Sequence, residues 1–347
     1  MERLSKDWTD DELLREIRRR ERRAGSGDRT RAAAAPAGRA RDLAGVPTGE
    51  LVRAAKGRQR VIYGSDNRQD IYQVSKPTVR RSADAVVALV KAADLNENAD
   101  GTFDLATESY KDAFDLCSGE PFVEQPTGCF CSGSLVAPDV VATAGHCVKN
   151  AADLATMRFV FGFHMTNATT PRTKFAADDV YAGKQLLGRQ LSNDGTDWAL
   201  VRLDRAVVGR QPVAVRTSGK INNSQALYVI GHPCGLPQKY APGAQVRDNG
   251  PAPFFVANLD TYGGNSGSPV FNAQNNQVEG ILVRGETDFV SSGDCNVSLV
   301  CPSTGCRGED VTRATVWSAK VPKAKSGGGS RAKSKKRAPI ASRGKRR

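Results

Sequence analysis

The stretch Gly263-Gly264-Asn265-Ser266-Gly267-Ser268-Pro269 places a serine in a glycine-rich turn just before an apolar segment. Thr143-Ala144-Gly145-His146-Cys147 lies upstream, and Asp197-Trp198-Ala199-Leu200-Val201-Arg202-Leu203 lies between the two. A serine hydroxyl is a weak nucleophile at neutral pH and needs an adjacent base. The order His, Asp, Ser therefore predicts a catalytic set in which a histidine takes the serine proton and an aspartate orients the imidazole. Its members are His146, Asp197 and Ser266.

The glycines before Ser266 allow the backbone to turn sharply at this point. Such a turn exposes the N–H groups of Gly264 and Ser266 to a developing oxyanion, and each donor contributes roughly 3–4 kcal/mol in comparable sites. We therefore predict that these two N–H groups form the oxyanion hole.

The three segments together resemble the chymotrypsin-like (trypsin-like) serine peptidases, and GNSGSPVF looks most like the glutamyl-endopeptidase branch of the bacterial enzymes. The resemblance covers about residues 61–317. It implies an all-β fold of two six-stranded antiparallel Greek-key barrels, with the catalytic residues in the cleft between them. It also implies a serine endopeptidase that works through an acyl-enzyme intermediate. Because the family's aspartate directly precedes an apolar strand, as Asp197 does, Asp194 and Asp204 are weaker candidates.

Hydrophobic patterning alone supports a less specific statement about the fold. Short apolar runs such as 134–136, 140–142, 199–201 and 228–230 alternate with turn residues, which is typical of an all-β barrel or sandwich. Residues 85–93 fit a strand or a helix equally well, because periodicity does not separate the two in a short apolar run.

The charge of the chain is concentrated at its two ends. The 347 residues carry a formal net charge of +13, of which residues 1–60 contribute +6 and residues 318–347 contribute +12, whereas the segment between them carries −5. We predict that 1–60 is a basic N-terminal extension or pro-segment with a short helix over 9–23, that 61–317 is the peptidase domain, and that 318–347 is a basic disordered tail. No run approaches the ~18 apolar residues of a membrane-spanning helix.

A second class of function follows from the basic ends. Clusters of Lys and Arg bind polyanions in a salt-sensitive way that does not depend on sequence, so nucleic-acid or polyanion binding is the alternative to proteolysis. A solvated tail with at most weak polyanion contact is the simpler interpretation. An esterase with the same catalytic residues is a third reading. We expect protein or peptide substrates, no cofactor, no metal, no membrane span and a monomer.

The eight cysteines all lie in the middle of the chain and form no CxxC pair. An even number suggests disulfides and an oxidising compartment, so a secreted or periplasmic location is favoured. The N-terminus nevertheless has no recognisable signal peptide, because acidic residues occupy its start and no apolar region follows. The resemblance implies a disulfide between Cys131 and Cys147 beside the histidine. The other six allow 15 pairings, although Cys295, Cys301 and Cys306 are close enough for a local bridge.

Substrate preference is open among basic, acidic and other P1 residues. By the family pattern, Asp260 can lie at the base of the specificity pocket, where a buried carboxylate favours Arg or Lys. The acid-selective branch has a histidine about where Leu282 stands, so glutamyl specificity is not supported there. Arg284 could bind an acidic side chain, although an exposed arginine is the simpler reading.

Three further features each allow a functional and a purely structural interpretation. The junction Arg60-Val61 resembles an activation site, although Asn265 stands where the digestive enzymes have the aspartate that pairs with the new amine; a flexible linker is the alternative. Residues 94–108 resemble a calcium loop, but Thr107 replaces the bidentate Glu, which favours a polar surface loop. We expect His164 and His232 to be structural.

Overall fold

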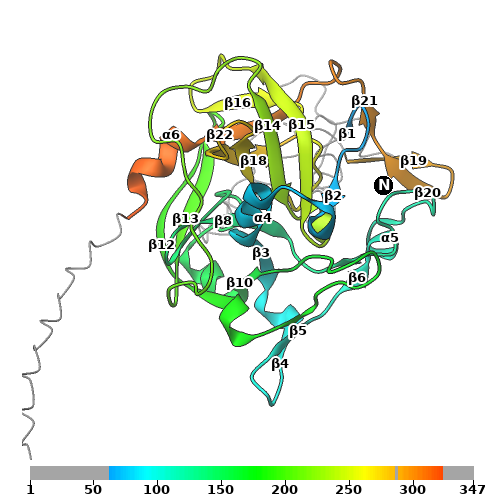
Figure 1. Cartoon of the computed structure of the whole chain (residues 1–347), viewed down its shortest axis with the longest axis vertical. Helices are drawn as coiled ribbons and strands as arrows, with labels where there is room; N and C mark the ends of the chain where they lie inside the picture. Colours follow the sequence, from blue (N-terminus) through cyan, green and yellow to red (C-terminus); the bar gives the residue numbers. More distant parts are fainter. Residues whose placement is uncertain (1–61, 286–287, 323–347) are drawn as a thin grey trace, which may run out of the picture.

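Two closed barrels of six antiparallel strands make up the body of the molecule (Figure 1). The structure is a computed structural model and describes residues 62–285 and 288–322. The predicted all-β, two-barrel fold is confirmed. The predicted helix over 9–23, the junction Arg60-Val61 and residues 323–347 of the predicted tail lie outside the described residues. The first residues of the predicted tail, 318–347, are ordered, because Ser318–Lys320 form a 3-10 turn.

The first barrel is built from six strands, of which β3 and β9 are rich in buried valine. Its strands follow the closed order β10-β12-β13-β9-β8-β3. Most of the ambiguous run 85–93 is a strand here, Val86–Lys91, because it pairs with β8 on one side and β10 on the other, and its residues 86–90 are buried. The strands are β3 (Val86–Lys91), β8 (Cys131–Ala137), β9 (Val140–Thr143), β10 (Met157–Phe161), β12 (Val180–Leu191) and β13 (Asp197–Leu203).

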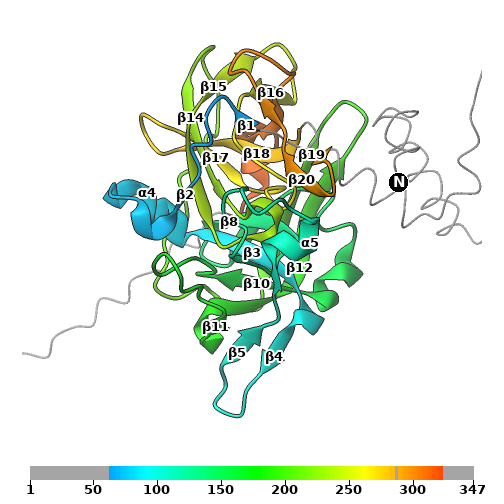
Figure 2. The ribbon, with the colours of Figure 1, turned by 90° about the vertical axis from the view of Figure 1, so that its right-hand side faces the viewer.

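The second barrel lies beside the first, and Figure 2 shows it above, in yellow and orange. Its strands follow the order β14-β17-β18-β22-β16-β15, and a further pairing of β14 with β15 closes the ring. A second apolar core fills it, with Phe255, Leu282 and Val311 fully buried. The strands are β14 (Ala226–Gly231), β15 (Lys239–Asp248), β16 (Phe254–Ala257), β17 (Pro269–Asn272), β18 (Val278–Arg284) and β22 (Glu309–Arg313).

The N-terminal part of the described chain runs along the second barrel before it enters the first. Strand β1 (Ile62–Tyr63) pairs in parallel with β21 (Val300–Cys301), and β2 (Gln69–Asp70) pairs with β15. Helix α4 (Pro77–Asp84) then leads into β3; proline is favourable at its first position because the missing N–H has no partner within a helix there. This helix was not predicted from the sequence.

Short strands, short helices and 3-10 turns lie around the two barrels. The hairpin β4–β5 projects from the first barrel (Figure 2), and its Asp100 faces Lys174 across 3.4 Å. The short strands are β4 (Leu95–Glu97), β5 (Phe103–Leu105), β6 (Glu108–Ser109), β7 (Pro126–Thr127), β11 (Lys174–Phe175), β19 (Phe289–Ser292) and β20 (Cys295–Ser298). The remaining α-helices are α5 (Tyr110–Phe114) and α6 (Ala314–Trp317). Short 3-10 turns cover Ile71–Gln73, Ala92–Asp94, Ala151–Thr156, Ala177–Asp179, Pro233–Gly235 and Ser318–Lys320.

Three disulfides cross-link the described residues. Cys301–Cys306 is the local bridge that the spacing suggested, whereas Cys117–Cys295 joins positions 178 residues apart and ties the segment after α5 to the β19–β20 hairpin. Cys131–Cys147 is the pair that the resemblance implied. Cys129 and Cys234 are not disulfide-bonded.

No helix in the described part of the chain is long and apolar enough to cross a membrane.

Candidate active site

His146 and Asp197 are in direct contact in the first barrel. His146 lies in the turn after β9, and Asp197 is the first residue of β13, the strand that pairs with β9. The Nδ1 atom of His146 lies 2.7 Å from Asp197 Oδ2, and the backbone N–H of His146 donates to Asp197 Oδ1 over 3.1 Å. Two contacts to one carboxylate fix both the position and the orientation of the imidazole.

Gly145 explains why the turn can come so close to β13. A Cβ atom at this position would lie 2.6 Å from the carbonyl oxygen of Gln190 and 2.8 Å from that of Trp198. Side-chain atoms do not approach backbone this closely, so a larger residue would push His146 away from Asp197. The glycine before the histidine is therefore required by the approach of two strands.

Asp197 is held ionised although it is almost completely buried, with 1% of its surface exposed. Burial by itself raises the pKa of Asp197, but the charge and hydrogen bonds of His146 and then the charge of Arg284 lower it, and the net pKa lies below the usual value. The carboxylate is therefore charged at neutral pH and accepts from the Nδ1–H tautomer of His146. This arrangement leaves Nε2 to face a proton donor.

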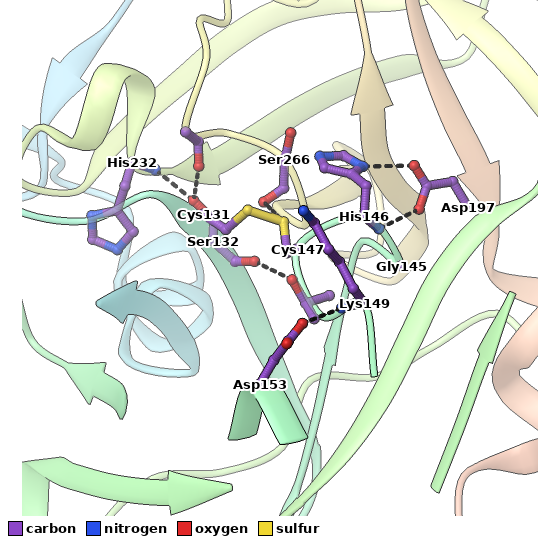
Figure 3. The surroundings of a disulfide bond; sticks show 12 residues. Cys131, Ser132, Gly145, His146, Cys147, Lys149, Asp153, Asp197, His232 and Ser266 are labelled. Atoms are coloured by element: carbon purple, nitrogen blue, oxygen red, sulfur yellow. Dashed lines mark hydrogen bonds and ion pairs between the residues drawn. A yellow bond between two sulfur atoms is a disulfide. The ribbon is translucent and has the colours of Figure 1, made fainter. Parts of the chain in front are cut away.

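Ser266 lies on the other side of the imidazole from Asp197, as Figure 3 shows. It belongs to the turn between 262 and 267, which comes from the second barrel and reaches the first barrel through backbone contacts. Ser132 N–H donates to the Ser266 carbonyl oxygen over 2.8 Å. The serine is 6% exposed, whereas the side chain of His146 is 35% exposed, so solvent reaches the pair from the histidine side.

One of the two predicted oxyanion donors, Gly264, lies in a backbone conformation that favours glycine. Gly264 has φ +86°, and a Cβ atom there would lie 2.5 Å from the carbonyl oxygen of His232. The neighbouring Gly263 N–H donates to Asp288 Oδ2 over 2.9 Å, and the Gly263 carbonyl accepts from Cys234 N–H. The turn that carries Gly264 and Ser266 is thus fixed by contacts on several sides.

Ser132 is a positioning residue that the sequence analysis missed. Its hydroxyl donates to the Gly264 carbonyl oxygen over 2.9 Å and accepts from His232 N–H over 3.0 Å (Figure 3). Its carbonyl oxygen accepts from the Thr143 hydroxyl over 2.7 Å. Ser132 is fully buried and so links the serine turn to the histidine strand. Only its place beside Cys131 could have drawn attention to it.

Ser132→Ala is expected to destabilise the protein by about 1–3 kcal/mol, because the buried Gly264 carbonyl and His232 N–H both lose a partner. The midpoint of urea unfolding is expected to fall accordingly. Ser75→Ala is the matched control, since Ser75 is exposed. An unchanged midpoint in Ser132→Ala would contradict this role.

The predicted specificity residues are dispersed. Leu282 is fully buried in the core of the second barrel. The Arg284 guanidinium is engaged, with Nε donating to Asp310 Oδ2 over 3.0 Å and Nη2 donating to the Gly195 carbonyl oxygen over 2.7 Å. It is therefore held beside the Asp197 end of the site, not exposed as the simpler reading expected.

Asp260 contacts the N-terminal segment of the described chain. Its Oδ1 accepts from Tyr63 N–H over 2.7 Å, and its Oδ2 accepts from Asn67 N–H over 3.3 Å. Next to it, the Thr261 hydroxyl donates to Glu309, a fully buried acid, over 3.2 Å. Glu309 and Asp288 were not predicted as site residues from the sequence, because they lie 48 and 25 positions along the chain from Thr261 and Gly263, which they contact.

The remaining histidines and acids have structural surroundings. The Nδ1 of His232 lies 3.0 Å from the Leu236 carbonyl oxygen, its ring stacks on Phe163, and burial lowers its pKa to about 4. Burial also lowers the pKa of His164. Asp194 accepts from Ser192 and Thr196, and Asp204 pairs with Arg205.

One group of side chains among the described residues has the spacing of metal ligands. The ligand atoms of Cys131, His146 and Cys147 lie within 4.8 Å of one another. The two sulfur atoms form a disulfide, however, and only a thiolate binds a metal well. These residues therefore do not fit a metal centre.

Residues 131–281 match the family of the trypsin-like peptidase domain. Among solved structures, a Glu endopeptidase in complex with MPD is similar, with 20% identity, a TM-score of 0.41 and coverage of 76% of this chain and all of that one. The VesB protease of Vibrio cholerae has 16% identity, a TM-score of 0.41 and coverage of 75% and 66%. An inactive form of the Rv3671c protease of M. tuberculosis has 14% identity, a TM-score of 0.40 and coverage of 75% and 97%.

No curated protein sequence matches this one. The matched range begins at the first residue of β8 and ends within β18, so it takes strands from both barrels. It includes His146, Asp197 and Ser266. Residues 131–281, which span parts of both barrels and hold all three residues, are therefore similar to a trypsin-like peptidase domain.

Proposed function

We propose that the protein is a serine endopeptidase that uses Ser266 as nucleophile, His146 as general base and acid, and Asp197 as the residue that orients His146. The observation that carries this proposal is the double contact of Asp197 with His146, at 2.7 and 3.1 Å, on the side of the imidazole away from Ser266 (Figure 3). A trypsin-like peptidase domain also favours proteins or peptides as substrates.

The chemistry proceeds in two halves. Ser266 Oγ attacks the carbonyl carbon of the scissile bond while His146 Nε2 takes its proton, and the buried charge of Asp197 stabilises the imidazolium that forms. His146 then gives the proton to the leaving amine, which departs and leaves an acyl group on Ser266. Water enters, His146 removes its proton, and collapse of the second tetrahedral intermediate releases the acid and restores Ser266.

The oxyanion of each tetrahedral intermediate needs donors that are already in place. We assign this role to the N–H groups of Gly264 and Ser266, as the glycine-rich turn suggests. The positive φ of Gly264 and the hydrogen bonds of Ser132 and Asp288 to this turn support the assignment. Fixed dipoles of this kind avoid the cost of reorganisation during the reaction.

An active-site label tests the proposal directly. The purified full-length chain is incubated with casein, an aryl ester and duplex DNA, with and without prior treatment by a small alkyl fluorophosphonate, which phosphonylates nucleophilic serines. We expect casein cleavage before treatment, its loss afterwards, and a mass increase confined to the peptide that contains Ser266.

Each contrary result identifies a different function. Ester hydrolysis without casein cleavage would favour an esterase that uses the same residues. DNA binding without any hydrolysis or labelling would favour a polyanion-binding protein that acts through its basic ends. Labelling at a serine other than Ser266 would overturn the assignment of the nucleophile.

A further inference from the structure

Asp260 is a buried acid whose contacts the reaction above does not use. It lies six residues before Ser266, and only 5% of its surface is exposed. Both of its carboxylate oxygens accept backbone N–H groups, from Tyr63 and Asn67. These donors lie almost 200 positions earlier in the chain, on the segment that runs along the second barrel.

That segment, residues 62–70, is anchored independently of Asp260. Ile62 N–H donates to the Leu299 carbonyl over 3.1 Å, and Gly64 N–H donates to the Cys301 carbonyl over 2.7 Å. At its other end β2 pairs with β15. Ile62 and Tyr63 are buried, at 1% and 4% exposure. The segment is therefore a fixed support against which a neighbouring loop can be held.

A second contact joins the same two pieces of chain. The guanidinium of Arg68 lies over the ring of Tyr262, 4.3 Å from its centroid, and is buried with only 1% of its side chain exposed. Cation–π contacts are strongest when the groups are desolvated, as they are here. Asp260 and Tyr262 thus hold alternate positions of the loop 260–262 against the segment 62–70.

This loop continues without interruption into the turn that carries Gly264 and Ser266. Asn265 N–H donates to the Tyr262 carbonyl over 3.0 Å, so the position of residue 262 is passed directly to the turn. Displacement of the loop would move the Gly264 N–H relative to the oxyanion. A misplacement of about 1 Å at a reacting centre can lower the rate about 10²-fold.

We infer that Asp260 is a positioning residue, which ties the loop 260–264 to the backbone of Tyr63 and Asn67 and so holds the Gly264 donor in place. The inference rests on the proposed function. It gives Asp260 a role different from the one that the family pattern implied, since both of its oxygens accept from protein backbone. The segment 62–70 then becomes part of the catalytic framework, because without it the carboxylate would lose both donors.

The charge state of Asp260 agrees with this role. Burial raises its pKa to about 6, against the hydrogen bonds of Tyr63 and Asn67, while Asp66 nearby raises it further and Arg68 lowers it. Above that pH the carboxylate is ionised and accepts both N–H groups. Protonation would place an O–H against one of these donors and weaken the attachment.

The test separates positioning from substrate selection and from simple loss of structure. Asp260→Asn and Asp260→Ala are assayed in the full-length chain on matched peptides with Arg, Glu and Ala at P1. Rates are divided by the concentration of sites that the fluorophosphonate labels. We expect kcat to fall about 10²-fold in Asp260→Ala and less in Asp260→Asn, which keeps one acceptor, with little change in KM. The loss should be equal for the three P1 residues.

Asp248→Asn is the matched control, because Asp248 is exposed on the same barrel and also accepts a backbone N–H, that of Gly250, over 2.8 Å. Its kcat should equal that of the wild type. A loss confined to Arg at P1 would make Asp260 a specificity residue and overturn the inference. An unchanged kcat per labelled site, with or without fewer labelled sites, would also overturn it.

The rate at which the fluorophosphonate reacts with Ser266 gives an answer that needs no peptide. We expect this rate to fall in Asp260→Ala as kcat does, and an unchanged rate would count against the inference. If the wild type reacts at Ser266 but cleaves no peptide, the proposed function fails and the positioning role is still measured.

Discussion

Replacement of Ser266 by alanine is expected to lower kcat for peptide hydrolysis about 10⁶-fold, because the reaction loses the atom that forms the acyl-enzyme intermediate. The fold should be retained, since Ser266 contributes its backbone carbonyl to the bond with Ser132 and alanine keeps that group. The measurement is the rate of casein and peptide cleavage, with the midpoint of urea unfolding as a check on folding. Cleavage that survives in Ser266→Ala would contradict the proposed mechanism.

Asp197→Asn provides the matched variant, because it preserves shape and removes only the charge. An amide facing His146 favours the wrong tautomer of the imidazole, and the same change in comparable sites lowers kcat about 10⁴-fold. The residual rate should exceed that of Ser266→Ala. Equal and small effects of both substitutions would argue against a catalytic set. If Ser266→Ala binds DNA as the wild type does, and neither the wild type nor this variant hydrolyses any substrate, the polyanion-binding alternative would be favoured.

The sequence was most informative where function depends on short segments. The motifs around His146 and Ser266, through their family resemblance, predicted two barrels, and patterning alone predicted only many short strands. The disulfide Cys131–Cys147 followed from the same resemblance. Each of these features depends either on residues that are close both in the chain and in space, or on a pattern that is already known from a family.

Contacts between distant segments could not be predicted. Ser132 and Gly264 are 132 positions apart, and Asp260 and Tyr63 are 197 apart, so no local pattern connects them. The strand Val86–Lys91 was ambiguous for a related reason, because only its partners β8 and β10 decide between strand and helix. Cys117 and Cys295 likewise meet only after both barrels have formed.

The largest expected effect on stability concerns the buried pair of Asp70 and Lys239. The two residues face each other across β2 and β15, and their side chains form a salt bridge with 5% and 2% exposure. Gln125 donates to the second oxygen of Asp70 over 2.9 Å, and the Lys239 ammonium lies 4.6 Å from the centroid of the Phe122 ring. Burial lowers the pKa of Lys239 to about 8, although Asp70 acts to raise it.

Asp70→Ala is therefore expected to cost about 3–5 kcal/mol at pH 7, because it leaves a buried ammonium without its carboxylate. Urea unfolding measures the loss, and Asp100→Ala is the control, since its contact with Lys174 is exposed and should contribute little to stability.

The dependence of this loss on pH identifies its cause. The unfolded chain binds more protons at Lys239 than the folded one between the two pKa values, so the stability contribution of Lys239 rises with pH there. In the wild type this window begins near pH 8 and ends near the ordinary value of 10.5. Removal of Asp70 lowers the pKa of Lys239 in the folded protein further and widens the window, so the stability deficit of Asp70→Ala should shrink between pH 7 and pH 10.

The double variant Asp70→Leu/Lys239→Met, which has no buried charge at these positions, should recover much of the stability at pH 7. A deficit that is constant with pH and remains in the double variant would show that lost packing, and not the unpaired charge, is responsible.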